Sequence, residues 1–335
     1  MSKKYIRIGF IGAGSIGSLF GGYLADIGSN TYSIEVIFFC MKPHADAINK
    51  TGLKIVRNQK IKIIKKIKAY ENEKSYNAKL EKDSSFRFDF IFLTTKAYDI
   101  KSALLQYEKV VNQSKRLVIL QNGIGNEDKV LRYCDKSKII RALTTNGAFL
   151  IKPGCVFHTG EGITKIGFPF ISEFNLESQE FKQAESDLNV LKEILALSGL
   201  KTIIVKNIIE ECWEKAFINI GINAIGALTR LPNGILFEVE GLKDIIGKAI
   251  KEAIKVAEMK NIKFPKKDYI SITHDVTRKT AENRNSMLQD ILNGQSTEIK
   301  FLNGRILKYA EDLGIKVPIN KILTHLILAL ERSGL

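Results

Sequence analysis

One lysine and two asparagines, each four residues from the next, form the most informative polar pattern of this sequence. Lys215, Asn219 and Asn223 lie within the run WEKAFINIGIN. On an α-helix, steps of four advance about 40° around the axis and about 6 Å along it, so the three side chains share one face. The residues between them are mostly apolar, so these polar groups are partly desolvated and need partners. Hydrogen bonds to another helix or to a bound ligand would both supply them.

A glycine pattern near the start of the chain is typical of a nucleotide site. Gly12-x-Gly14-x-x-Gly17 follows a short apolar run and precedes a run with helical spacing. A strand that turns tightly into a helix leaves N–H groups and the positive end of the helix dipole facing outward, which suits a pyrophosphate. An ordinary glycine-rich turn is the alternative. The expected dinucleotide contacts are Gly12, Ala13, Gly14, Ser15, Ile16 and Gly17.

The end of the second expected strand, over residues 33–41, bears on the choice of nucleotide. A Rossmann fold meets the adenosine ribose here, and an NAD site places Asp or Glu to accept from the 2′-OH. This chain instead has Cys40-Met41-Lys42-Pro43, with no carboxylate before Asp46. Lys42 therefore favours NADP, although a solvated surface lysine is the alternative.

Two later apolar runs also end in polar residues. Residues 88–95 are followed by Lys96, and residues 117–120 run into Gln121-Asn122-Gly123. The carboxyl ends of parallel strands form the ligand-binding edge of an open α/β sheet. Asn122-Gly123 alone would equally pass for a turn.

The order of the remaining patterns predicts two domains. Up to residue 205 we expect paired strands over 52–70, a polar loop over 71–85, a strand over 139–148, a hairpin over 156–166, a helix over 178–198 and a strand over 201–205. From Asn207 onward we expect helices over 210–228, 242–260, 271–293, 297–313 and 319–333. This change marks a boundary near Lys206. The predicted fold is α/β: a Rossmann-type dinucleotide-binding domain over residues 1–206, followed by an all-α domain over 207–335.

His158 and the four scattered cysteines indicate no further chemistry. His158 has no triad or metal partner nearby and is expected to be a surface or structural residue. The cysteines show no C-x-x-C spacing, so neither a disulfide framework nor a zinc site is predicted. They are Cys40, Cys134, Cys155 and Cys212.

Composition is that of a soluble globular protein, with 335 residues, 45% hydrophobic and 26% charged. No apolar run approaches the roughly 20 residues of a membrane helix, and no secretory leader is recognisable, so the expected location is the cytoplasm. The net charge of 51 − 36 = +15 raises the question of a polyanionic partner. Because the lysines are spread over the whole length, we expect no nucleic-acid binding; an anionic cofactor and substrate would benefit from the same field.

Three further candidates lie in the helical half. Asn233 belongs to the turn Leu231-Pro232-Asn233-Gly234, and Ser286 begins the run SMLQD. Glu298 follows Ser296-Thr297 as a first-turn acid follows a helix cap, for which dipole stabilisation is a sufficient reason.

Together these blocks resemble the ketopantoate reductase (2-dehydropantoate 2-reductase) family over nearly the whole chain. The lysine–asparagine helix and the ordered Ser, Asp, Thr-Glu, Asn-Gly series are more specific than the glycine loop. The matching blocks are GAGSIG at 12–17, TTK at 94–96, QNG at 121–123, TTNGA at 144–148, WEKAFINIGIN at 213–223, LPNG at 231–234, and SMLQD followed by TEIKFLNG at 286–304.

The resemblance implies a Rossmann domain, a helical domain and an active site in the cleft between them. It implies NADPH-dependent reduction of 2-dehydropantoate to (R)-pantoate, a step towards pantothenate and coenzyme A. The catalytic residues would be Lys215, as proton donor to the ketone oxygen, and Glu298, the acid beside the cofactor. Asn219, Asn223, Asn233 and Ser286 would hold the substrate, Asn122 would lie where substrate and cofactor meet, and Lys96 and Ala148 would line the nucleotide site.

Some alternatives stay open at this point. Many family members carry arginine where this chain has Lys42, and a lysine grips phosphate less specifically, so the NADPH preference could be weaker. A reductase of another branched 2-oxo acid or a non-catalytic NADPH sensor would share the nucleotide loop, but a sensor needs no proton donor. A monomer or a homodimer would fit, and the lysine-rich segment 60–85 receives no function.

Overall fold

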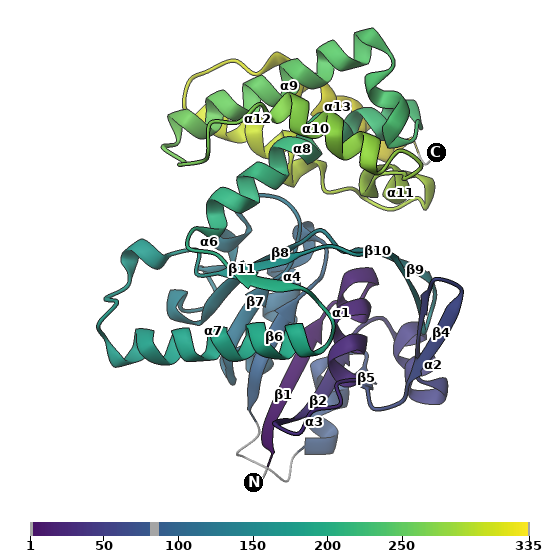
Figure 1. Cartoon of the computed structure of the whole chain (residues 1–335), viewed down its shortest axis with the longest axis vertical. Helices are drawn as coiled ribbons and strands as arrows, with labels where there is room; N and C mark the ends of the chain where they lie inside the picture. The colour runs from purple at the N-terminus through teal and green to yellow at the C-terminus, as the bar shows by residue number, and fades with distance from the viewer. Residues whose placement is uncertain (1–2, 81–86, 334–335) are drawn as a thin grey trace. The chain divides into compact units, whose positions relative to one another are not determined.

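The computed structural model describes residues 3–80 and 87–333, which divide into two compact units (Figure 1). The first unit comprises Met1–Gln121 and Asn126–Ile208, and the second comprises Asn122–Gly125 and Ile209–Leu335. The second unit therefore contains four residues that interrupt the sequence of the first unit. The predicted fold class, a Rossmann-type α/β unit followed by a helical one, is confirmed.

An eight-stranded sheet forms the centre of the first unit, in the order β12-β11-β8-β7-β6-β1-β2-β5. The six strands from β5 to β8 are parallel, and β11 runs antiparallel to β8. This is the doubly wound order, with its switch point between β1 and β6. The strands are β1 (Lys4–Ile11), β2 (Tyr32–Phe39), β5 (Lys68–Tyr70), β6 (Phe88–Leu93), β7 (Ser114–Ile119), β8 (Ile139–Thr144), β11 (Thr164–Gly167) and β12 (Thr202–Ile204).

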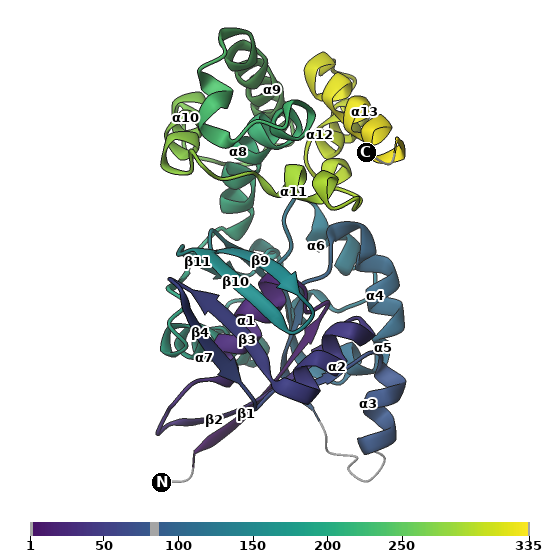
Figure 2. The same cartoon turned by 90° about the vertical axis from the view of Figure 1, so that its right-hand side faces the viewer.

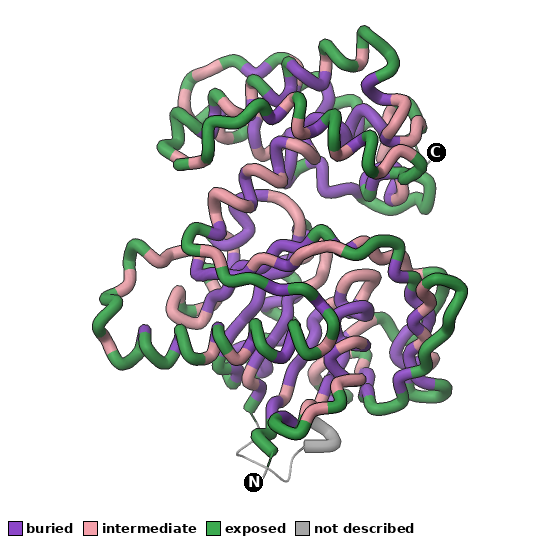
Figure 3. The backbone as a smooth tube through the Cα atoms, in the orientation of Figure 1, coloured by how far each residue is buried: buried purple, intermediate pink, exposed green. Residues whose placement is uncertain are grey.

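The central strands are almost continuously apolar because helices cover both faces of a parallel sheet. Phe10 of β1 stacks on Phe92 of β6 with 4.6 Å between ring centroids, and Phe38 of β2 meets Phe10 edge-on at 5.5 Å. All three rings are fully buried, and Figure 3 shows these strands as the buried centre of the unit.

Helix α7 of the first unit buries one face, whereas α1 is buried along most of its length. In α7 the apolar residues Phe181, Ala184, Leu188 and Leu191 recur at helical spacing and are buried, and Ser178 caps the helix by accepting from the Phe181 N–H. The helices are α1 (Ser15–Ala25), α2 (Lys42–Thr51), α3 (Glu73–Leu80), α4 (Ile100–Gln106), α5 (Glu108–Asn112), α6 (Asn126–Val130) and α7 (Gln179–Leu197).

A second, four-stranded sheet packs on α1 (Figure 2). Its order is β4-β3-β10-β9. Two adjacent glycines let α1 approach both sheets: a Cβ on Gly21 would overlap the Phe38 ring, and one on Gly22 would lie 2.6 Å from Ile55 Cδ1. The strands are β3 (Leu53–Arg57), β4 (Lys60–Ile64), β9 (Gly147–Lys152) and β10 (Cys155–Gly160).

The prediction of a polar loop over 71–85 is wrong, because α3 occupies part of it. Asn72 caps this helix by accepting from the Ser75 N–H at 2.9 Å. Tyr76 is buried against the rings of Tyr70 and Phe88, which provides the apolar contact that a polar composition conceals. Residues 81–85 of the predicted loop lie outside the described residues.

The prediction of a hairpin over 156–166 is also wrong, because β10 and β11 belong to different sheets. β10 pairs with β9 and β3, whereas β11 pairs with β8 and β12. The chain crosses between the sheets at Gly162, whose N–H donates to Asn146 Oδ1 at 3.0 Å. Alternation of residue types cannot distinguish a strand that turns back from one that changes sheets.

Among its described residues, the second unit packs six helices around one apolar core that includes Phe217, Ile220, Ile246 and Ile250. In the described part of the chain no helix is long and apolar enough to cross a membrane. The helices are α8 (Ile208–Thr229), α9 (Glu240–Met259), α10 (Tyr269–Lys279), α11 (Ser286–Leu292), α12 (Asn303–Asp312) and α13 (Pro318–Arg332).

Two long helices predicted in this unit are each interrupted. The segment 271–293 breaks between α10 and α11, where the Asn283 carbonyl accepts from the Asn233 N–H at 2.9 Å. The segment 297–313 begins with a short 3₁₀ turn, Ile299–Phe301, and Leu302 then leaves the helical region with φ −117° and ψ −105° before α12. Both breaks depend on tertiary partners that helical periodicity does not reveal.

Candidate active site

The glycine loop joins β1 to α1 at the carboxyl edge of the large sheet. Gly12 has φ +80°, and a Cβ there would overlap Thr95 and lie 2.7 Å from its Cα, so only glycine lets the chain pass the end of β6. A Cβ on Gly14, by contrast, would meet only the Gly12 carbonyl at 3.9 Å. The Gly14 side of the loop is therefore open, as close approach of a ligand requires.

The start of α1 fits an anion. The N-cap residue, Gly14, has no side chain that could cap this fully described helix, and the first turn holds no acidic residue. First-turn N–H groups have no partner inside a helix, and the dipole favours negative charge at this end. The loop thus fits the pyrophosphate of a dinucleotide.

Lys42 lies on the first turn of α2, after β2 has ended at Phe39. Its Nζ is 2.7 Å from Asp46 Oδ2, one helical turn later, and the side chains are 61% and 62% exposed. The hydrogen bond and charge of Asp46 raise the pKa of Lys42. An exposed pair of this kind is weak, so a phosphate could compete with Asp46 for the lysine.

Lys96 follows a strand of the large sheet, whereas Ala148 lies in the small sheet. Lys96 is half-buried after β6, and its carbonyl accepts from Gln121 Nε2 at 3.3 Å. The same amide donates to the Thr95 carbonyl at 2.8 Å and so ties the ends of β6 and β7 together. Ala148 is half-buried on β9 opposite His158. The glycine loop, Lys42 and Lys96 therefore follow three adjacent parallel strands, and Ala148 belongs to the sheet that packs on α1.

His158 is a structural residue, as predicted. It is buried, and its Nε2 donates to the Gly160 carbonyl at 3.0 Å. Its Nδ1 therefore accepts from the Tyr23 hydroxyl at 2.8 Å, which fastens β10 to α1.

In the second unit, Lys215 is bonded to Asn122. Lys215 lies on α8, and its Nζ donates to Asn122 Oδ1 at 2.9 Å. Asn122 begins the four-residue loop that belongs to this unit, and the Ile124 N–H holds the loop by donating to the Phe301 carbonyl at 3.2 Å. A lysine and an asparagine distant in the sequence thus form one polar pair.

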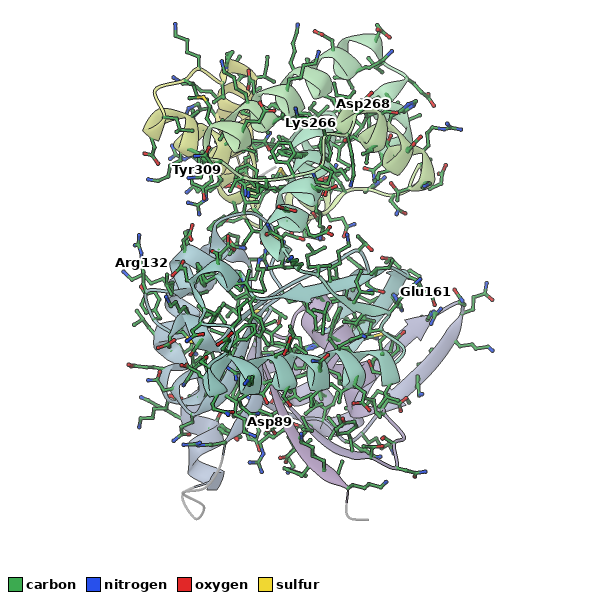
Figure 4. All side chains as sticks on the ribbon, turned by 60° about the vertical axis from the view of Figure 1, so that its left-hand side comes forward. Asp89, Arg132, Glu161, Lys266, Asp268 and Tyr309 are labelled. Atoms are coloured by element: carbon green, nitrogen blue, oxygen red, sulfur yellow. The ribbon has the colours of Figure 1, made fainter. Side chains whose placement is uncertain are left out.

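A ring contact supports the α8 turn that carries Lys215. Trp213 packs against Tyr309 of α12, labelled in Figure 4, with 6.1 Å between centroids and 25° between ring planes. The Lys260 Nζ lies 4.2 Å from the centroid of the Tyr309 ring. The start of α8 is therefore held against α12, two residues before Lys215.

Four of the predicted site residues line one hollow in the second unit, which is partly open to solvent. Asn122 and Asn223 reach it from the loop and from α8, Ser286 from α11, and Glu298 from the segment before the 3₁₀ turn. Lys215 is connected to it through Asn122. The remaining lining residues are Met287, Asp290 and Leu302.

Asn219 and Asn233 do not belong to this lining. Asn219 is half-buried on α8 between Lys215 and Asn223. Asn233 is buried, and its Nδ2 donates to Thr280 Oγ1 at 3.0 Å. Its Oδ1 is buried and has no hydrogen-bond partner among the described residues. Such an acceptor calls for a partner, and a ligand hydroxyl would supply one.

Asn285 positions Ser286. Its Oδ1 accepts from the Leu288 N–H at 2.9 Å, which caps α11, and its Nδ2 donates to the Ile222 carbonyl of α8 at 3.3 Å. It packs so closely on Gly226 that a Cβ there would overlap its Nδ2. One buried amide thus connects α8 to the helix that begins with Ser286.

Glu298 is the N-cap residue of the 3₁₀ turn Ile299–Phe301, but its side chain makes no capping hydrogen bond. The Thr297 hydroxyl accepts from the Ile299 N–H at 3.2 Å, and it donates to Glu331 Oε1 at 2.6 Å. The capping expected of this segment is therefore done by Thr297. Glu298 makes no side-chain capping bond, is 7% exposed and lines the hollow.

Sequence reasoning missed Met287, Asp290 and Leu302. Asp290 lies one helical turn after Ser286, so spacing on α11 could have found it. It places a second buried carboxylate in the lining besides Glu298. Met287 and Leu302 give the hollow its apolar wall, and no local pattern separates them from ordinary core residues.

Two family profiles match the chain. The one described as "Ketopantoate reductase PanE/ApbA" matches residues 8–169, and "Ketopantoate reductase PanE/ApbA C terminal" matches residues 207–331. The chain is 35% identical to a 2-dehydropantoate 2-reductase of Pyrococcus abyssi over 96% of its own length and 97% of the relative. It is 36% identical to the protein of that name from Pyrococcus horikoshii, over 98% and 99%.

Solved structures agree with this match. A PanE/ApbA family ketopantoate reductase from Ralstonia eutropha is 26% identical, with a TM-score of 0.83 over 98% of this chain and 99% of the other. D-mandelate dehydrogenase with NADH and anilino(oxo)acetate is 25% identical, with a TM-score of 0.84 over the same fractions. The chain therefore belongs to the ketopantoate reductase family.

Proposed function

We propose that this protein reduces 2-dehydropantoate to (R)-pantoate with NADPH, a step of pantothenate and coenzyme A biosynthesis. The observation that carries the proposal is the Lys215–Asn122 pair at a hollow lined by Asn223, Ser286 and Glu298. Full-length similarity to proteins named 2-dehydropantoate 2-reductase supports the choice of substrate. In this proposal residues 1–206 bind the nucleotide, and residues 207–335 hold the substrate and carry the catalytic lysine.

Reduction of a ketone adds a hydride to carbon and a proton to oxygen. When bound, NADPH supplies the hydride. Negative charge builds on the ketone oxygen as the hydride arrives, so the ammonium group of Lys215 stabilises the transition state and then donates the proton. Asn122 Oδ1 accepts from the Lys215 Nζ and so fixes the direction in which the lysine points.

The other site residues would bind the substrate. Asn219, Asn223 and Ser286 donate hydrogen bonds to a carboxylate or hydroxyl without adding a charge that competes with Lys215. The buried Oδ1 of Asn233 would accept from the substrate hydroxyl. The apolar side chains of the hollow, Met287 and Leu302, suit the branched carbon of 2-dehydropantoate.

The nucleotide assignment rests on residues of the first unit and, by family resemblance, on Asn122, Ala148 and Glu298. The open side of Gly14 and the uncapped start of α1 suit the pyrophosphate, and Lys96 follows the neighbouring strand. Lys42 would meet the 2′-phosphate of NADPH. We expect the enzyme to act in the cytoplasm, as a monomer or a homodimer.

A pair of variants tests the choice of NADPH. Lys42→Ala should weaken NADPH binding and leave NADH binding unchanged, because only NADPH carries the 2′-phosphate. Asp46→Ala should strengthen NADPH binding, because it frees Lys42 from its ion pair. Equal effects of Lys42→Ala on both nucleotides would refute the role of this lysine.

A substrate panel tests the reaction. NADPH consumption should be fastest, by kcat/KM, with 2-dehydropantoate and slower with α-ketoisovalerate, which is branched but lacks the hydroxymethyl group. Phenylglyoxylate tests the second candidate function, reduction of an aryl 2-oxo acid, which the similarity to D-mandelate dehydrogenase favours. A higher kcat/KM with either competitor would overturn the proposed substrate, and nucleotide binding without turnover of any 2-oxo acid would favour a sensor.

A further inference from the structure

A buried histidine connects the glycine loop to the turn between β9 and β10. His44 lies on α2 and is 4% exposed. Its Nδ1 is 2.9 Å from the Gly154 backbone nitrogen, and its Nε2 is 2.9 Å from Ser18 Oγ. Because an amide N–H can only donate, Nδ1 accepts and carries no proton. The proton of the neutral imidazole is therefore on Nε2.

This tautomer gives the hydrogen-bond chain one direction. The Gly154 N–H donates to His44, His44 Nε2–H donates to Ser18 Oγ, and the Ser18 hydroxyl donates to the Ala13 carbonyl at 3.2 Å. Burial lowers the pKa of His44 to about 4, so the imidazole is neutral near pH 7. Ser18 is fully buried, so its hydroxyl cannot exchange these hydrogen bonds for bonds to water. Loss of the His44 or Ser18 side chain therefore leaves its neighbour in the series without a hydrogen-bond partner.

This series of hydrogen bonds ends inside the glycine loop, at Ala13. Ala13 is the residue between Gly12 and Gly14, and both the Gly12 and Ala13 N–H groups donate to the Phe39 carbonyl, at 2.9 and 3.2 Å. With its carbonyl held by Ser18, Ala13 is bonded on both sides of its backbone. The orientation of the following peptide groups, which open the anion site at α1, is thereby restricted.

His44 also lies two residues after Lys42. The same imidazole that holds Ser18 holds the first turn of α2 against Gly154. A single side chain thus connects the loop that suits a pyrophosphate with the turn that carries the lysine assigned to a 2′-phosphate.

We propose that His44 is a positioning residue for the nucleotide, acting through Ser18 to hold the glycine loop in its binding conformation. The inference rests on the proposed dinucleotide site. It predicts that loss of the bridge weakens nucleotide binding and spares the steps carried by the second unit.

The first test is Ser18→Ala, which removes the bridge and keeps the imidazole. Since one hydrogen bond contributes about 0.5–1.5 kcal/mol, the Kd for NADPH, measured by fluorescence titration, should rise about 2- to 12-fold. NADH should weaken by the same factor, because both nucleotides carry the pyrophosphate. The kcat at saturating NADPH and the KM for the 2-oxo acid should stay within about twofold of wild type.

Tyr23→Phe is the matched control. It removes one hydrogen bond of the same helix, from Tyr23 near the C-terminal end of α1 to His158 of β10, and leaves the bonds of Ser18 and His44 in place. Its nucleotide affinity should equal that of wild type. If it weakens NADPH binding as much as Ser18→Ala does, general packing of the small sheet explains the effect and the inference fails.

A second pair keeps the test decisive if Ser18→Ala unfolds. His44→Gln retains an amide N–H that can donate to Ser18 and an amide oxygen that can accept from the Gly154 N–H, whereas His44→Leu retains neither. NADPH should bind more tightly to the Gln variant than to the Leu variant. Equal affinities of these two, or a folded Ser18→Ala variant with wild-type affinity, would overturn the inference. Failure of the wild type to bind either nucleotide would instead refute the dinucleotide site itself.

Discussion

The contact between Gly226 and Asn285 predicts that Gly226→Ala destabilises the wild type but stabilises a variant that lacks the Asn285 side chain. Gly226 is buried in α8, and a Cβ there would overlap Asn285 Nδ2. That amide cannot move freely, because its two ends cap α11 and bond the Ile222 carbonyl. Gly226→Ala must therefore displace it.

The magnitude follows from the bonds at stake. Loss of the cap costs about 1 kcal/mol, and loss of the bond to Ile222 costs about 1 kcal/mol. Alanine in place of glycine within a helix stabilises the fold by about 1 kcal/mol. Gly226→Ala should therefore destabilise the wild type by about 1 kcal/mol. In the Asn285→Ala background the amide is absent, the next atom is Leu236 Cδ1 at 3.7 Å, and the same change should stabilise by about 1 kcal/mol.

Urea unfolding of the four proteins measures this cycle. The chain has one tryptophan, Trp213, buried in α8, so its fluorescence reports on the helical unit of the intact protein. The coupling between the two sites should be about 2 kcal/mol. A Gly226→Ala effect of the same sign and size in both backgrounds would refute the assignment of Asn285 as the link between α8 and α11.

Three further perturbations test other parts of the structure. The pKa of His44 is lowered from 6.5 to about 4 in the fold, so its contribution is complete above about pH 6.5 and is lost as pH falls towards 4. At 1.36 kcal/mol per pKa unit this amounts to about 3 kcal/mol. The free energy of unfolding of the wild type, measured in urea, should therefore decline over that range, and His44→Gln should flatten the decline; parallel curves of the two proteins would contradict this contribution. Met287→Ala removes side-chain volume from the apolar wall of the hollow and so leaves more room for an aryl group. The ratio of kcat/KM for phenylglyoxylate to kcat/KM for 2-dehydropantoate should rise about 10-fold, and an unchanged ratio would show that Met287 does not contact the substrate. Gly12→Ala would place a Cβ at a residue with φ +80° and against Thr95. It should therefore lower the thermal midpoint of unfolding and abolish nucleotide binding, and tight nucleotide binding by this variant would refute the loop geometry.

Features set by neighbours in the sequence could be predicted from it. The glycine loop, the parallel strands around it and the shared face of Lys215, Asn219 and Asn223 all follow from spacing over a few residues. The alternation of strands and helices, followed by helices alone, was enough for the fold class.

Features set by distant partners could not be predicted. Nothing near Lys215 indicates that its Nζ meets Asn122, or that the loop beginning at Asn122 joins the helical unit. The break before α11 depends on Asn285, whose partner Ile222 is on another helix. The hydrogen bonds from His44 to Ser18 and from Ser18 to the Ala13 carbonyl have no local signal in the sequence either, because each bond joins two different structural elements.

The proton-donor role of Lys215 is the central claim, and one comparison tests it directly. Turnover of 2-dehydropantoate with saturating NADPH should fall at least about 100-fold in Lys215→Ala, as expected on removal of a general acid. The Kd for NADPH should remain that of wild type, which separates the lost chemistry from lost binding. A Lys215→Ala variant with wild-type kcat would contradict the account.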